Sequence, residues 1–77
     1  MLKIYGSRLC PDCVQCLADL DRQGVEYEYH DFGEDLWALK SFLAIRDRDP
    51  QFEAIRAGGS IGIPCIVHDD GSVHLSW

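Results

Sequence analysis

The stretch Cys10-Pro11-Asp12-Cys13 lies between a short apolar run and a segment in which apolar residues recur at helical spacing. Two cysteines separated by two residues can form a disulfide only where the backbone turns sharply, and the first turn of a helix provides such a turn. Pro11 suits the first helical position, because the amide hydrogen that a proline lacks would have no partner there. The motif therefore predicts the order strand, cysteine pair, helix.

This arrangement gives the two thiols different roles. Cys10 would lie beside the free amides and positive end of the helix, where a thiolate is stabilised over a thiol. Cys13 follows one turn later and is turned toward the helix. We expect Cys10 to be the nucleophile that attacks a disulfide, and Cys13 to resolve the mixed disulfide that forms.

The remaining sequence predicts a single α/β domain over residues 1–77. Short apolar or alternating runs predict strands, and apolar residues three and four apart predict helices. The helix between the first two strands makes them parallel neighbours, whereas a tight turn at Asp69-Asp70-Gly71 makes the last two antiparallel. The expected strands are 2–5, 25–30, 65–68 and 73–77. The expected helices are 11–23, a second that begins at 36 and ends near 46–49, and 50–57.

Charge and composition exclude several classes of protein. A net charge of -6 without a basic cluster argues against binding to nucleic acid. No apolar run approaches the length of a membrane span, and the start MLKIYG does not resemble a signal peptide. We therefore expect a cytoplasmic protein, a setting in which four cysteines indicate catalysis or metal binding rather than structural disulfides.

A strand, the CPDC motif and a helix, followed by Gly62-Ile63-Pro64 before a hairpin, resemble the glutaredoxin branch of the thioredoxin-fold superfamily. The resemblance covers nearly the whole chain. It implies a thioredoxin-like fold, with a four-stranded mixed sheet and flanking helices. It also implies a cis peptide bond before Pro64, with the backbone of Ile63 pairing with an extended substrate.

The function that this resemblance implies is thiol-disulfide oxidoreduction, which serves electron transport and cell redox homeostasis. The substrates would be protein or small-molecule disulfides, and the electron donor would be a thiol reductant or a reductase. No cofactor is required, and glutathione is one candidate reductant. The residues expected to contact substrate are Arg8, Pro11, Asp12, Ile63 and Pro64.

Two features depart from the family pattern. Asp12 stands where typical members carry an aromatic residue, and its charge should make the thiol pair more reducing. The usual C-terminal helix is lacking, because the sequence ends with the expected strand 73–77. The sheet face that this helix would cover could be covered by a partner, by a second copy in a homodimer, or by the third helix.

Other functions remain open at this point. The chain could be a redox-regulated binding module that does not catalyse disulfide exchange. Alternatively, Cys10, Cys13, Cys16 and Cys65 could ligate zinc or an iron-sulfur cluster. We expect no metal site, because a regular helix spreads its three cysteines over about a third of its circumference at 3.6 residues per turn. The arsenate reductase group also shares the early cysteine and helix, but this chain is too short for its insert.

Several side chains are expected to have structural roles. Cys16 and Cys65 should be packed as small apolar residues, and Trp37 should belong to the core between helix and sheet. Trp77 could pack on the open sheet face or contact another chain. His30, His68 and His74 are expected on strands without a common site.

Overall fold

The computed structural model describes all 77 residues and contains one four-stranded mixed sheet. Its central strand β1 (Leu2–Gly6) pairs in parallel with β2 (Tyr27–Asp31) and antiparallel with β3 (Cys65–Val67), and the strand order is β2-β1-β3-β4. The edge strand β4 (Val73–His74) pairs antiparallel with β3. The expected α/β class, with a mixed sheet and flanking helices, is confirmed.

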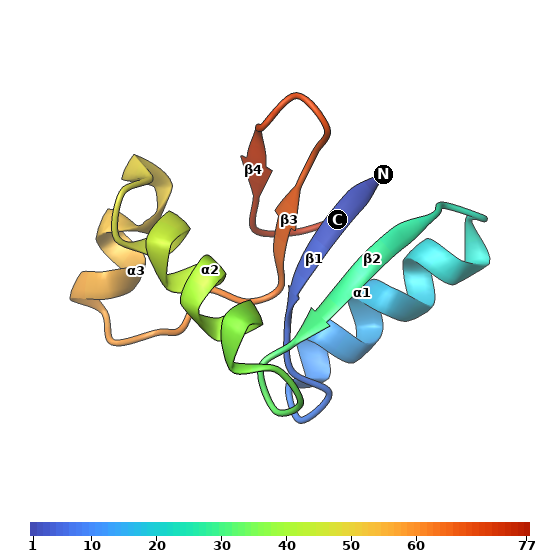
Figure 1. Cartoon of the computed structure of the whole chain (residues 1–77), viewed down its shortest axis with the longest axis horizontal. Coiled ribbons are helices and arrows are strands. Elements are labelled where there is room, and N and C mark those ends of the chain that lie inside the picture. Colours follow the sequence, from blue (N-terminus) through green and yellow to red (C-terminus); the bar gives the residue numbers. More distant parts are fainter.

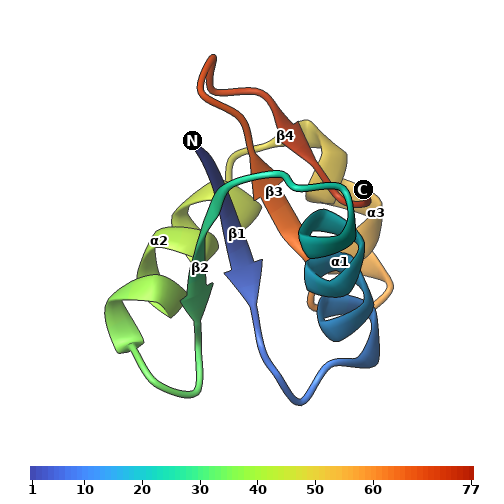
Figure 2. The same ribbon diagram turned by 90° about the vertical axis from the view of Figure 1, so that its right-hand side faces the viewer.

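Helices cover both faces of this sheet (Figures 1 and 2). Helix α1 (Pro11–Arg22) lies on one face, and α2 (Leu36–Arg46) lies on the other. The chain then forms a 3-10 turn, η1 (Pro50–Phe52), and a short helix, α3 (Glu53–Ala57). None of these helices is long and apolar enough to cross a lipid bilayer.

Two apolar clusters follow from the alternation of side chains along β1 and β3. The cluster under α1 contains Ile4, Cys16, Leu17, Leu20 and Ile66. The cluster on the opposite face contains Tyr5, Phe42, Phe52 and Cys65. The neighbouring residues Ile4 and Tyr5 therefore stabilise different layers, and Cys65 is separated from the cysteines of α1 by the sheet.

The predicted elements are mostly confirmed, with differences at their ends. β2 begins at Tyr27 rather than at Val25, and the expected third helix is divided into η1 and α3. β4 contains only two residues, because Leu75–Trp77 leaves the sheet and lies alongside α1. No helix follows β4 in the chain. Gly24 adopts the left-handed conformation expected after α1, with a φ of 70°.

The prediction that Trp37 belongs to the core is wrong. The Trp37 side chain is 71% exposed, and Leu36 beside it is 77% exposed. Ala38 and Phe42 are the buried residues of α2. Many apolar residues on α2 suggested a wide buried face, but only one side of the helix contacts the sheet. The Lys40 ammonium lies 4.8 Å from the centre of the Trp37 indole, which fits a solvent-exposed ring.

Candidate functional site: a cysteine pair at the start of α1

Cys10 and Cys13 are placed by the start of α1, as the motif predicts. Cys10 is the N-cap residue with extended backbone angles, and Pro11 is the first helical residue. The Val14 amide donates a hydrogen bond to the Cys10 carbonyl, which begins the helical pattern. Cys10 is half-buried, whereas Cys13 is fully buried, and both are free thiols. One thiol is therefore open to a substrate while the other is enclosed.

The environment of Cys13 disfavours its thiolate. Burial is the main cause that raises the pKa of the Cys13 thiol, to about 12. The Cys10 side chain, within hydrogen-bonding reach, raises this pKa further, whereas a hydrogen bond from the Ser7 amide lowers it. A thiol with so high a pKa stays protonated at neutral pH. Cys13 therefore has the properties of a second, resolving thiol rather than of the first nucleophile.

Gly6, the last residue of β1, makes room for this buried sulfur. A Cβ atom at Gly6 would lie 2.7 Å from the Cys13 Sγ, closer than two such atoms can approach, and 3.7 Å from the Tyr29 hydroxyl. The expected first strand, 2–5, stops before Gly6. The packing role of Gly6 could not be predicted, because it depends on where α1 crosses β1.

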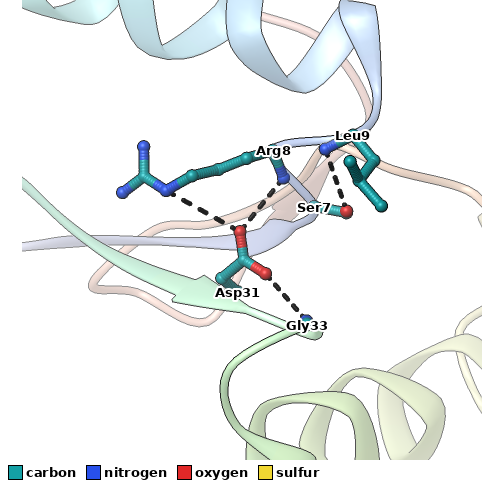
Figure 3. A network of polar contacts seen from close by, with 5 residues as sticks. All are labelled: Ser7, Arg8, Leu9, Asp31 and Gly33. Carbon is teal, nitrogen blue, oxygen red and sulfur yellow. Dashed lines mark hydrogen bonds and ion pairs between the residues drawn. The ribbon is translucent and has the colours of Figure 1, made fainter.

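Asp31 holds the loop that precedes the cysteines, and sequence reasoning missed this function too. Its buried carboxylate accepts hydrogen bonds from the Arg8 amide at 3.0 Å and from the Gly33 amide at 2.7 Å (Figure 3). Burial alone would raise the pKa of Asp31, but the hydrogen bonds from Gly33 and Arg8 outweigh it, and the pKa is lowered. The Gly33 contact is a local turn that the sequence could have indicated. The Arg8 contact joins residues 23 positions apart.

Arg8 lines neither of the two surface hollows at the cysteine pair. Its guanidinium lies 5.0 Å from the centre of the Tyr29 ring, and its Nε lies 3.9 Å from the Asp31 carboxylate. Figure 3 shows the side chains of Arg8 and Leu9 leaving the loop in opposite directions. In this arrangement Arg8 supports the loop, and its expected contact with substrate is not evident.

The peptide bond between Ile63 and Pro64 is cis, as the resemblance implies. Ile63 lines two surface hollows. The first, the Cys10 hollow, has a volume of about 490 Å³ and also includes Cys10 in its wall. The second, of about 250 Å³, includes Asp12 and Pro64 and is closed on one side by residues 75–77. Four of the five expected substrate-contacting residues thus lie at or beside the cysteine pair, with Pro11 exposed at the start of α1.

Cys16 and Cys65 are both buried, and of the two only Cys16 lies beside the site, where it lines the second hollow. Cys16 is packed in the core under α1, and Cys65 is packed on the opposite sheet face, as expected for both. Burial raises the pKa of each thiol, to about 12 for Cys65. No group of three or more histidine, cysteine or acidic side chains has an arrangement suited to a metal ion.

Fold and site together define a class: a small α/β protein with an accessible and a buried cysteine at the start of its first helix. The chain belongs to the same family as an uncharacterized protein of Haemophilus influenzae (strain Rd), to which it is 35% identical over 72 residues. That match covers 94% of this chain and 84% of the relative. No protein-family model matches the chain, and no solved structure matches it.

Proposed function

We propose that this protein is a glutaredoxin-like thiol-disulfide oxidoreductase with a thioredoxin-like fold. The observation that carries the proposal is that two neighbouring thiols differ in solvent accessibility. Cys10 is partly accessible at a helix N-terminus, whereas Cys13 is buried beside it and has a raised pKa. The position of Ile63, which lines the same hollow as Cys10, supports the same proposal.

The reaction has two exchange steps. The Cys10 thiolate attacks one sulfur of the substrate disulfide, so that a Cys10–substrate bond forms and the first substrate thiolate leaves and takes a proton from solvent. Cys13 then loses its proton to solvent and attacks the Cys10 sulfur, which releases the second substrate thiolate. The substrate gains two electrons, and the protein is left with a Cys10–Cys13 disulfide that an external thiol reductant must reduce.

The backbone of Ile63 provides a means of holding a substrate. Neither its amide nor its carbonyl makes a hydrogen bond within the protein. An extended polypeptide could pair with these two groups while its disulfide lies against Cys10. Glutathione and a separate reductase are both consistent with the regeneration step.

The test is the reduction of 2-hydroxyethyl disulfide, with dithiothreitol as the regenerating reductant and the uncatalysed rate subtracted. We expect Cys10→Ser to abolish turnover. In a parallel reaction without dithiothreitol, we expect Cys13→Ser to accumulate a mixed disulfide on Cys10 that mass spectrometry detects. Cys65→Ala, a change at a buried thiol on the opposite sheet face that lines neither hollow, serves as the control and should retain activity. Full activity in Cys10→Ser would refute the proposal, and stoichiometric binding without turnover would favour the redox-regulated binding module.

A further inference from the structure

The Cys10 hollow has two walls that are far apart in sequence. One wall comes from the loop before α1 and includes Leu9 and Cys10, and the other comes from the segment 59–63 and includes Ile61 and Ile63. Its volume of about 490 Å³ is in the size range of sites for small organic groups. Any group joined to Cys10 by a disulfide must therefore lie in or beside this hollow.

The 59–63 wall is held in place before a substrate arrives. Arg46 donates one hydrogen bond to the Ile61 carbonyl at 2.9 Å and another to the Ser60 carbonyl at 2.7 Å. Gly62 has a φ of 94° and lies so close to the Phe52 ring that a Cβ there would be 2.6 Å from a ring carbon. Because these contacts order the wall in advance, little conformational entropy is lost when a ligand binds to it.

Apart from the Cys10 thiolate that the proposed reaction requires, no residue that lines the hollow carries a charge, although the chain as a whole has a net charge of -6. The nearby arginines are engaged elsewhere. The Arg8 side chain lies beside Asp31 (Figure 3) and over the Tyr29 ring, and Arg46 donates to backbone carbonyls. Glutathione carries two carboxylates, and these would meet no cation in the wall. The charge distribution thus favours an uncharged occupant.

Two side chains of the wall are apolar and unusually accessible. Leu9 is 93% exposed, and Ile61 is 58% exposed. Removing apolar surface from water is favourable at about 25 cal/mol per Å². An apolar side chain seated between Leu9 and Ile61 would bury part of all three surfaces, whereas a polar side chain would gain nothing from the contact.

We propose that the Cys10 hollow selects disulfide-bonded polypeptides that carry an apolar side chain next to the reacting cysteine, in preference to glutathione disulfide. This inference rests on the proposed function and specifies its substrate class. The substrate backbone pairs with Ile63, and the flanking apolar side chain contacts Leu9 and Ile61. The disulfide is then presented to the Cys10 sulfur.

The experiment compares reduction rates for symmetrical disulfides of capped tripeptides with leucine, serine or aspartate on both sides of the cysteine. Glutathione disulfide and 2-hydroxyethyl disulfide are measured beside them. We expect the leucine peptide to react about tenfold faster than the serine peptide, which corresponds to the burial of roughly 60 Å² of apolar surface. The aspartate peptide and glutathione disulfide should be slower still.

The double variant Leu9→Ser, Ile61→Ser tests the wall directly. Both side chains are exposed, so the substitutions should leave the fold intact. The ratio of the leucine-peptide rate to the 2-hydroxyethyl disulfide rate should fall about tenfold. Leu36→Ser is the matched control, because Leu36 is 77% exposed and lines neither hollow at the site; it should leave the ratio unchanged.

The outcomes separate this inference from the proposed function. Reduction of 2-hydroxyethyl disulfide, with equal rates for the three peptides or an unchanged ratio in the double variant, would overturn the inference and leave the oxidoreductase proposal standing. Faster reduction of glutathione disulfide than of the leucine peptide would overturn it as well. Failure to reduce any of the five disulfides would instead refute the proposed function.

Discussion

Gly6 is a residue whose missing side chain has a direct chemical consequence, because the Cys13 sulfur occupies the space that a Cβ would take. In Gly6→Ala the buried sulfur must move or β1 must shift. We expect the free energy of unfolding to fall by about 1–3 kcal/mol, and the resolving step to slow because Cys13 no longer lies correctly beside Cys10. Urea denaturation measures the first effect, and the lifetime of the mixed disulfide measures the second.

Gly24→Ala is a suitable control for Gly6→Ala. Gly24 has a φ of 70° but nothing within 4 Å of its added Cβ. This substitution should cost about 1–2 kcal/mol through backbone strain alone and leave the mixed-disulfide lifetime unchanged. Equal lifetimes in both variants would show that Gly6 has no role in placing Cys13.

Asp31 is a second residue with an effect on the site, exerted through the loop it holds. In Asp31→Asn the amides of Arg8 and Gly33 lose a charged acceptor, and we expect a loss of about 1–3 kcal/mol at pH 7. The native pKa of Asp31 is below its ordinary value of 3.8, so this stabilisation is present above that value and disappears as the pH falls through the native pKa. The two proteins should therefore converge in stability in acid.

Asp70→Asn is the matched control for Asp31→Asn. Asp70 accepts a hydrogen bond from the amide two residues later, as Asp31 does, but it is exposed. This variant should lose less stability than Asp31→Asn in the same urea experiment at pH 7. A loss at Asp31 no larger than that at Asp70 would contradict the role of the buried carboxylate.

At the scale of elements, Arg46 connects the end of α2 to the wall of the Cys10 hollow. Arg46→Met keeps much of the side-chain length but removes the hydrogen bonds to Ser60 and Ile61. We expect a loss of about 1–2 kcal/mol in stability, and faster hydrogen exchange in the segment 59–63. Arg48→Met is the control, because the Arg48 side chain donates only to the Ala44 carbonyl in the last turn of α2. If hydrogen exchange in the segment 59–63 changes equally in both variants, Arg46 does not hold this segment in place.

The elements themselves were largely predictable. The spacing of apolar residues indicated every helix and strand, since that periodicity depends on residues close together in the chain. Their ends were less predictable. The residues 75–77 continue an apolar pattern, yet the structure takes them out of the sheet, where the Trp77 indole donates to Gln23 at the end of α1. A pairing partner across the sheet, rather than local propensity, decides whether a strand continues.

At the scale of the whole molecule, buried thiols on both faces of the sheet make stability sensitive to alkaline pH. The pKa values of Cys13 and Cys65 are raised from 9.0 to about 12, so between these values the native state binds more protons than the unfolded state. The contribution of these two thiols to the free energy of unfolding should therefore be constant below about pH 9. It should fall as the pH rises from 9 toward 12. Urea denaturation at a series of pH values measures the slope.

Cys65→Ala isolates the contribution of one face in that series. It removes a fully buried thiol far from the cysteine pair, so the variant starts from a lower stability but should lose less of it above pH 9. If the free energy of unfolding of Cys65→Ala falls with pH as steeply as that of the wild type above pH 9, Cys65 does not contribute to the alkaline loss of stability.

The sequence by itself determined the local chemistry of this protein: a cysteine pair at the start of a helix, preceded by a strand and followed by a second parallel strand. These features depend on residues within one turn or one crossover of each other. Only the tertiary structure decided that Gly6 faces the Cys13 sulfur, that Asp31 binds the Arg8 amide, and that Trp37 is exposed. Such contacts depend on how helices cross the sheet and on side-chain packing between distant segments, and no local pattern in the chain specifies either.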